Sequence, residues 1–175
     1  MSTEPTLSRA RWAQDEAALK ALRETVFVHE QGVPPEIEWD GRDREAVHVI
    51  ARDGDQAIAC GRLLADGKIG RMAVLPAWRG RGVGAAVLAA LVDEARQGGL
   101  RRVYLHAQAH AERFYAGQGF AAEGERFEEA GIPHLAMARD IDFLDCPVAV
   151  APVYQPEPFA TLLLSLARSA RRQLA

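Results

Sequence analysis

The pattern of apolar and polar residues near the N-terminus predicts an amphipathic helix. Leu19, Leu22 and Val26 recur at helical spacing within residues 15–29, and Asp15 stands where an N-cap is expected. The stretch that follows is rich in proline, glycine and acidic residues, so it predicts a long loop.

Three apolar runs come next, and short turns separate them. The runs cover residues 46–52, 58–64 and 68–74, and each turn between them contains an Asp-Gly pair. Parallel strands need a crossover of a dozen or more residues, so connections this short predict antiparallel neighbours.

The second half of the chain alternates between helices and strands. An apolar helix over residues 83–97 ends at a glycine pair, which is a typical C-terminal signal. The elements predicted after it are a strand, a short helix and two strands around a loop at 128–133; they lie at 101–107, 110–119, 120–127 and 134–140.

The C-terminal segment, residues 140–175, has a different composition. Its prolines predict an extended connection, and an apolar stripe from Phe159 to Leu174 predicts an amphipathic helix. We expect this helix to pack on its own domain or on a second copy of the chain, which would make a homodimer. A basic helix lying on a membrane is the alternative, because three arginines stand near the end of the stripe.

Composition and charge argue against nucleic-acid-binding, membrane and metal-binding proteins. The 175 residues are 49% hydrophobic and 26% charged, with a formal net charge of −3, which is ordinary for a soluble domain and gives no attraction to nucleic acid or acidic membranes. Cys60 and Cys146 match neither a metal-ligand spacing nor a redox pair, so we expect free thiols and no metal. Residues 1–12 lack the apolar core of a signal peptide, and no run approaches the roughly 20 residues of a membrane span. A cytoplasmic protein is expected.

A glycine-rich turn at residues 79–84 stands directly before the long helix. Such turns commonly bind phosphate, because the N–H groups of the first helical turn and the positive end of the helix dipole face the anion. No lysine follows these glycines, which excludes a Walker loop. A dinucleotide fingerprint is also excluded, because the upstream strands are antiparallel and the expected acidic residue is missing.

This turn and its surroundings resemble the GNAT superfamily of acyl-CoA-dependent N-acyltransferases. Residues 79–84 match the family's [QR]-x-x-G-x-[GA] loop, and residues 111–120 resemble its A-x-x-F-Y-x-x-x-G-F segment. Residues 23–43 and 131–137 are similar to the ElaA-like branch. The resemblance implies a GNAT domain over residues 1–139 with an α/β fold. Its mixed, mainly antiparallel sheet would be splayed between the fourth and fifth strands and flanked by helices, with acyl-CoA held in the splay.

The resemblance also implies which residues hold acetyl-CoA as the acyl donor. The splay leaves main-chain groups of the fourth strand unpaired, and the pantetheine amides can satisfy them. The N–H groups of residues 79–84 would hold the pyrophosphate. The predicted cofactor-binding residues are Met72, Ala73, Val74, Arg79, Gly80, Arg81, Gly82, Val83, Gly84 and Gln108.

Acyl transfer to an amine needs an oxyanion donor, a proton donor for the thiolate and a route for the amine's proton. By resemblance, the Val74 N–H is the oxyanion donor and Tyr115 is the proton donor. Many relatives carry an acidic residue on the fourth strand, but this chain has Ile69, Gly70 and Arg71 there. The candidates for the general base are Glu30, His106 and His134, and a water chain is the alternative.

The function implied is transfer of an acetyl group from acetyl-CoA to a primary amine of a small molecule or peptide, by direct attack in a ternary complex. A non-catalytic acyl-CoA-binding protein of the same fold and a structural protein that depends on the tail helix are the alternatives. Loops 30–46 and 128–134 would form the acceptor pocket. Their acids (Glu30, Glu36, Glu38 and Asp40) weakly suggest a cationic acceptor, but solvated loop acids explain them better.

Overall fold

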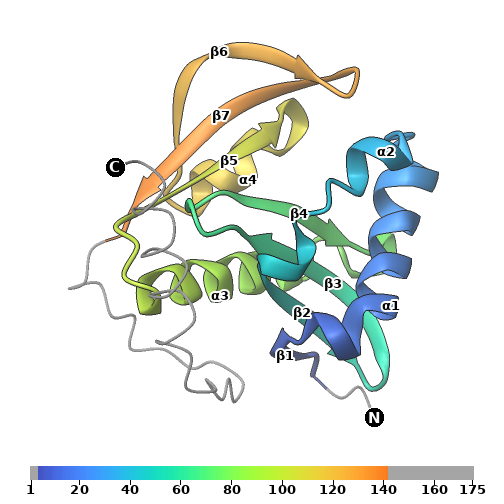
Figure 1. Cartoon of the computed structure of the whole chain (residues 1–175). Coiled ribbons are helices and arrows are strands. Elements are labelled where there is room, and N and C mark those ends of the chain that lie inside the picture. The colour runs from blue at the N-terminus through green and yellow to red at the C-terminus, as the bar shows by residue number, and fades with distance from the viewer. Residues whose placement is uncertain (1–3, 142–175) are drawn as a thin grey trace.

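The computed structural model describes residues 4–141, and Figure 1 shows how their helices and strands are arranged. The short elements η2, η3 and η4 are 3₁₀ helices, and η1 is π-helical. In chain order the elements are β1 (Thr6–Ala10), α1 (Trp12–Arg23), η1 (Glu24–Glu30), α2 (Pro35–Glu38), η2 (Asp43–Glu45), β2 (Val47–Asp53), β3 (Gln56–Leu63), β4 (Ile69–Val74), η3 (Pro76–Trp78), α3 (Val83–Gln97), β5 (Arg102–Gln108), η4 (Ala109–Ala111), α4 (Glu112–Gly117), β6 (Ala121–Glu129) and β7 (Ile132–Asp140).

The strands form two sheets that meet at a single point. The first has the order β1-β2-β3-β4 and the second β5-β7-β6, and neighbours within each sheet are antiparallel. A parallel bridge between Lys68 and Tyr104 joins the two sheets just before β4 begins. Beyond this bridge β4 and β5 run apart, as Figure 1 shows. The predicted mixed, mainly antiparallel sheet that is splayed between its fourth and fifth strands is therefore confirmed.

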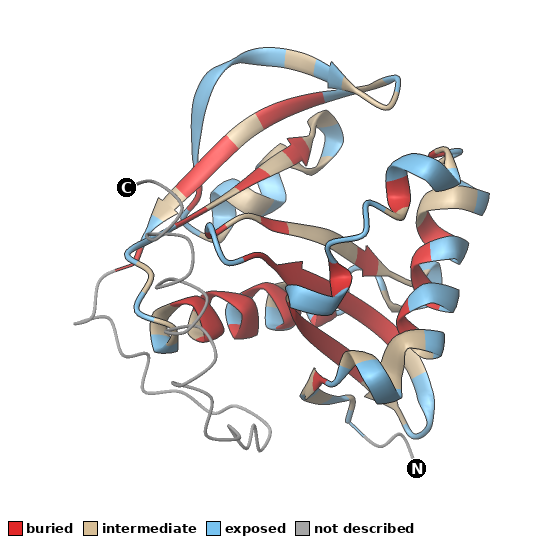
Figure 2. Ribbon diagram, in the orientation of Figure 1, coloured by how far each residue is buried: buried red, intermediate tan, exposed pale blue. Residues whose placement is uncertain are grey.

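The core lies on both faces of the first sheet (Figure 2). One layer fills the space under α3, where Val87, Leu88 and Leu91 are almost completely buried. The other lies under α1, where Leu19 and Leu22 are buried as the helical spacing predicted. Truncating a buried leucine of this kind to alanine typically lowers the free energy of unfolding by about 2–5 kcal/mol. Packing in these two layers therefore holds the first sheet between α1 and α3.

Three local features differ from the sequence predictions. The strand β1 was not predicted; it is a short edge strand, and pairing with β2 rather than its own pattern holds it in place. The first helix begins at Trp12 instead of Asp15, and the Asp15 carboxylate accepts a hydrogen bond from the Arg11 N–H at 2.8 Å. The loop expected at 128–133 is instead a tight hairpin turn, because Ala130 and Gly131 both adopt positive φ, as a two-residue hairpin requires.

The C-terminal end of the described chain closes the second sheet. Ile141 is buried, and its N–H donates to the Arg101 carbonyl at 2.8 Å. The amphipathic helix predicted near residues 159–174, and the homodimer it would support, lie outside the described residues. Between residues 4 and 141, no helix is long and apolar enough to cross a membrane.

Candidate active site

A large cavity opens where β4 and β5 separate. It has a volume of about 940 Å³ and extends from the start of α3 to the hairpin of β6 and β7. Most of the predicted site residues line it: Glu30, Met72, Val74, Arg79, Gly80, Gly82, Gly84, Gln108, Tyr115 and His134. The side chains of three others face elsewhere: Ala73 packs in the layer under α1, Val83 packs in the layer under α3, and Arg81 lies over the Trp78 ring at 5.0 Å.

The glycine-rich turn presents unpaired N–H groups to this cavity. Gly80 and Gly82 have φ values of +72° and +80°, which side-chain-bearing residues rarely adopt. No atom lies within 4 Å of where a Cβ would stand on either glycine. Within the described chain, the N–H groups of residues 83–85 have no main-chain partner, and the first bond of α3 runs from Ala86 to the Gly82 carbonyl. An anionic group can therefore approach the helix N-terminus closely, and a phosphate fits these donors.

Arg79 anchors the turn instead of pointing at the cavity as a free charge. Its guanidinium forms two 2.7 Å hydrogen bonds with the Glu30 carboxylate, and its Nε donates to the Val74 carbonyl at 3.0 Å. Its own N–H donates to the Pro76 carbonyl, so the free donors of the turn begin after it. The hydrogen bond from Arg79 lowers the pKa of Glu30. Glu30 therefore holds Arg79 in place and is ionised over the neutral range.

The end of β4 offers a main-chain donor in the middle of the cavity. The Leu75 N–H is bonded to the Ile58 carbonyl of β3 at 2.9 Å. Hydrogen bonding alternates along an antiparallel pair, so the N–H of the preceding residue, Val74, points away from β3 and toward β5. The β3–β4 register shifts before this point, and Arg71 has φ +52°. This geometry makes the Val74 N–H available to a carbonyl oxygen held between the strands.

Tyr115 lines the same cavity from α4. Its ring packs at 4.9 Å from Phe114 and 6.1 Å from Phe120, with an interplanar angle of 70° in both pairs. Burial raises the pKa of its phenol to about 12. The hydroxyl group is therefore protonated at neutral pH and can donate a proton or a hydrogen bond.

The far end of the cavity carries polar side chains from β5 and from the β6–β7 hairpin. Gln108 donates to the Gln31 side chain at 2.8 Å and so links β5 to the end of η1. His134 is mostly buried, and its Nδ1 lies 2.7 Å from the Ile132 carbonyl oxygen. His106 Nδ1 lies 2.8 Å from the Glu129 carboxylate. Two histidines are thus oriented by hydrogen bonds beside the opening.

Comparison with known proteins identifies the family. The model for the acetyltransferase (GNAT) domain matches residues 13–141. The chain belongs to the GNAT acetyltransferase family. This GNAT domain is 40% identical over 135 residues to the uncharacterized N-acetyltransferase YjcF of Bacillus subtilis, which covers 73% of the chain and 96% of the relative.

Solved structures agree with this assignment. Escherichia coli ElaA is 36% identical over 132 residues, covering 71% of this chain and 86% of ElaA. Its crystal structure superposes with a TM-score of 0.70 at 32% identity, covering 77% of this chain and 99% of that one. An acyl-CoA N-acyltransferase from Pseudomonas aeruginosa gives a TM-score of 0.69 at 36% identity, covering 78% of this chain and 99% of that one. The resemblance to the ElaA-like branch is therefore confirmed.

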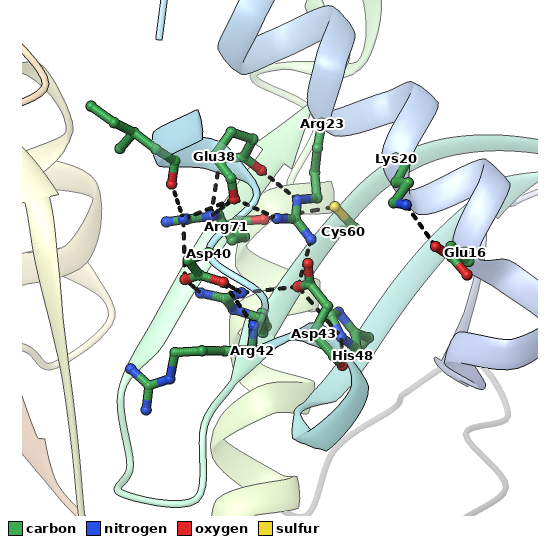
Figure 3. Close-up of polar contacts among 12 residues, drawn as sticks. Glu16, Lys20, Arg23, Glu38, Asp40, Arg42, Asp43, His48, Cys60 and Arg71 are labelled. Carbon is green, nitrogen blue, oxygen red and sulfur yellow. Dashed lines mark hydrogen bonds and ion pairs between the residues drawn. The ribbon is translucent and has the colours of Figure 1, made fainter. Parts of the chain in front are cut away.

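Next to the cavity, this GNAT domain contains a charge network that the sequence did not predict (Figure 3). Arg23, with no exposed surface, binds both Glu38 and Asp43. The network continues through two arginines that bind the same acids and Asp40: Arg62 from β3 and Arg71 from β4.

Three of the four loop acids are paired with arginines: Glu30 with Arg79, Glu38 with Arg71 and Asp40 with Arg62. The interpretation of these three as free, solvated carboxylates is therefore wrong. Glu38 is 2% exposed, and its carboxylate lies 2.9 Å from Arg71 Nε. The hydrogen bond from Arg62 holds the pKa of Asp40 far below its usual range. Arginines of the protein itself already neutralise these acids, so they give no support to a cationic acceptor.

The described chain shows neither a metal centre nor a reactive thiol. Between residues 4 and 141, no group of three or more His, Cys, Asp or Glu side chains could hold a metal ion. Cys60 is buried under α1, and burial raises the pKa of its thiol to about 12. A thiol of this kind stays protonated and is a poor nucleophile.

Proposed function

We propose that the protein transfers an acetyl group from acetyl-CoA to a primary amine. One observation carries the proposal: a single cavity connects the unpaired N–H groups at the start of α3, the Val74 N–H and the Tyr115 hydroxyl. These are donors for an anion, for a polarised carbonyl oxygen and for a leaving sulfur. An acyl-CoA carries a matching group for each donor: a pyrophosphate, a thioester carbonyl oxygen and a thioester sulfur.

The residues present fit an acyl-CoA mainly through their main chain. When bound, acetyl-CoA supplies an electrophilic thioester carbonyl and a thiolate leaving group. The N–H groups of residues 83–85 would hold its phosphates, as a helix N-terminus does. The Val74 N–H would stabilise the negative charge that develops on the carbonyl oxygen, and Tyr115 would protonate the sulfur.

Direct attack by the amine is the route that these residues favour. A covalent acyl-enzyme needs an activated nucleophile, and the one cysteine in the described chain, Cys60, is buried and protonated. The cavity is large enough for both substrates, because ligand pockets typically measure about 300–1,000 Å³. A ternary complex of protein, acetyl-CoA and amine is therefore proposed.

The test is a panel of small-molecule and peptide amines incubated with acetyl-CoA and the full-length protein. Release of free CoA and the mass of the acceptor are followed together. We expect at least one acceptor to gain an acetyl group, with initial-rate lines that intersect when both substrates are varied. Parallel lines would contradict direct attack. Binding of acetyl-CoA without turnover of any amine would support the non-catalytic alternative and overturn the enzymatic proposal.

A further inference from the structure

The splay between β4 and β5 begins beside His106. These two strands run parallel from the bridge between Lys68 and Tyr104, so Gly70 and His106 come level two residues further on. Both residues line the large cavity. His106 therefore stands at the point where the space between the strands begins, on the side of β5 that carries Gln108.

The acidic groups near β4 are already committed to arginines. Glu38 is enclosed by Arg23 and Arg71, with 3% of its side chain exposed. Glu30 is bound by both terminal nitrogens of Arg79. The hydrogen bond from Arg79 lowers the pKa of Glu30, which makes it a weak proton acceptor. Burial raises the pKa of Glu38, but its two carboxylate oxygens are already paired with Arg23 and Arg71 and are not free to take a proton from an amine.

His106 has the geometry of an oriented base. Its Nδ1 lies 2.8 Å from a Glu129 carboxylate oxygen, and the Phe127 ring packs edge-on at 4.9 Å. An ionised carboxylate can only accept, so Nδ1 carries the proton in this pair and Nε2 keeps its lone pair. Within residues 4–141, Nε2 has no hydrogen-bond partner, and 30% of the side chain is exposed in the cavity wall.

Neighbouring basic side chains keep Glu129 ionised. Burial raises its pKa, but the hydrogen bond from His106 and the charges of His106, Lys68 and His134 outweigh burial and lower it. Lys68 Nζ lies 3.3 Å from His106 Nδ1, which is further away than the carboxylate. Glu129 thus remains an acceptor and can stabilise the positive charge of a protonated His106. His134 differs from His106, because within the described chain no carboxylate oxygen lies within 4 Å of its ring nitrogens and its Nδ1 is paired with the Ile132 carbonyl instead.

We infer that His106 is the general base of the reaction and that Glu129 is its positioning residue. As the amine nitrogen bonds to the thioester carbon, one proton leaves the nitrogen for Nε2 of His106. The carbon–sulfur bond breaks, and the sulfur takes the Tyr115 proton. His106 then loses its proton to water and Tyr115 regains one from water, which gives amide and free CoA in balance. This assignment rests on the proposed function.

The first test compares His106→Asn with the wild-type protein, using an acceptor from the amine panel. Asparagine keeps an N–H for Glu129 but has no basic nitrogen. We expect kcat to fall about 10²–10⁴-fold, the usual contribution of a positioned base, while acetyl-CoA raises Tm as in the wild type. The matched control is His29→Asn, because His29 has a side chain 69% exposed and lies outside the cavity. It should keep the wild-type kcat. A wild-type kcat in His106→Asn overturns the inference.

The second test needs no variant for its main result. Nitrogen NMR of histidine-labelled wild-type protein reads the tautomer of His106 directly, and we expect the proton on Nδ1. A proton on Nε2 overturns the inference. In Glu129→Leu we expect this preference to be lost and kcat to fall, with the acetyl-CoA Tm shift retained. An unchanged tautomer in that variant contradicts the role given to Glu129.

The two tests separate this inference from the proposed function. If the wild-type protein releases no CoA with any amine, the transferase proposal fails, and the tautomer still reports on the His106–Glu129 pair. If the wild type is active and His106→Asn is equally active, only the assignment of the base fails.

Discussion

The two walls of the cavity are built from different kinds of groups. On the wall formed by β4 and the start of α3, the exposed donors are main-chain N–H groups, and glycines keep side chains out of their way. On the wall formed by the end of η1, β5 and the β6–β7 hairpin, the polar groups are side chains held in pairs, such as Gln31 with Gln108 and His106 with Glu129. The main-chain wall suits a ligand that all members of the family share, such as an acyl-CoA. The side-chain wall suits an acceptor that differs from one member of the family to another.

This difference predicts how substitutions should act. On the main-chain wall, most side chains can change without loss of a donor, but replacing a glycine at positive φ strains the backbone. On the side-chain wall, one substitution leaves its partner unpaired and alters the shape of the acceptor site. Tyr115 lines the cavity from α4, and its hydroxyl is the proposed proton donor for the leaving sulfur.

The largest effect is expected for Tyr115→Phe. The variant keeps the ring packing and removes only the donor, so kcat should fall about 10²–10⁴-fold while the acetyl-CoA Tm shift stays unchanged. Steady-state kinetics with chemistry limiting the rate measures this. The control is Tyr104→Phe, because the Tyr104 hydroxyl donates to Asp66 at 2.9 Å outside the cavity. Tyr104→Phe should keep the wild-type kcat, and a wild-type kcat in Tyr115→Phe would show that Tyr115 is only a packing residue.

Breaking the charge network next to the cavity should give the next largest effect, on stability. Arg23→Met removes one partner of two buried acids, which typically costs about 3–5 kcal/mol of unfolding free energy. Urea unfolding measures it. Lys20→Met, one turn earlier on the same helix, removes an exposed pair with Glu16 and should cost less than about 1 kcal/mol. Similar costs for the two variants would mean that the network contributes no more than a surface pair.

Substituting one glycine should remove ligand binding from the main-chain wall. A ligand at about 100 times its Kd adds about 2.7 kcal/mol to the free energy of unfolding. Gly82→Val should lose this stabilisation by acetyl-CoA, because the valine side chain would block the approach of the phosphates to the start of α3. Differential scanning fluorimetry with acetyl-CoA measures the shift. Gly54→Val is the matched control, because it places the same side chain at φ +55° in the turn between β2 and β3. It should be destabilised but should keep the shift. An unchanged shift in Gly82→Val would exclude residues 79–84 from phosphate binding.

The smallest effect is expected for Asp40→Asn, and it depends on pH. Arg62 lowers the pKa of Asp40 in the folded protein. The pair therefore contributes its full stabilisation at pH values above the pKa of Asp in the unfolded chain, about 3.9. This stabilisation is lost as the pH falls toward the lower pKa of Asp40 in the folded protein. At neutral pH we expect the variant to be about 1.5 kcal/mol less stable, since the carboxylate is partly exposed. Urea midpoints from pH 7 to pH 3 should converge between wild type and variant. A constant difference would contradict the pairing.

The fold could be predicted where local patterns and tertiary packing agree. The helix over residues 83–97 has the predicted bounds, because its apolar face, the glycine before it and the glycine pair after it all favour the same ends. β1 could not be predicted, since five residues with one large apolar side chain take strand form only by pairing with β2. The tight β6–β7 turn was missed because Ala130 rarely adopts the positive φ that the hairpin imposes.

The same contrast explains which part of the site the sequence could reveal. Residues 79–84 form a continuous motif, and together with the predicted strand and helix beside it and the segment at 111–120 it indicated the family from the sequence. The side-chain pairs His106–Glu129, Arg79–Glu30 and Gln31–Gln108 join residues that are separated by 23, 49 and 77 positions in the chain. A single sequence carries no local signal for pairs so far apart. For Glu30 and His106, the sequence supplied candidates, and the fold showed which is held by an arginine and which by a carboxylate.

The central claim is that unpaired main-chain donors along β4 and α3 hold acetyl-CoA, and amide hydrogen exchange tests it most directly. We expect acetyl-CoA to slow the exchange of the N–H groups of Val74 and of residues 83–85. Leu75, whose N–H is already bonded to Ile58, should change little. The claim is contradicted if these amides exchange equally fast with and without acetyl-CoA. It is equally contradicted if protection appears instead around the smaller cavity of about 190 Å³ beside Asp40 and Arg42.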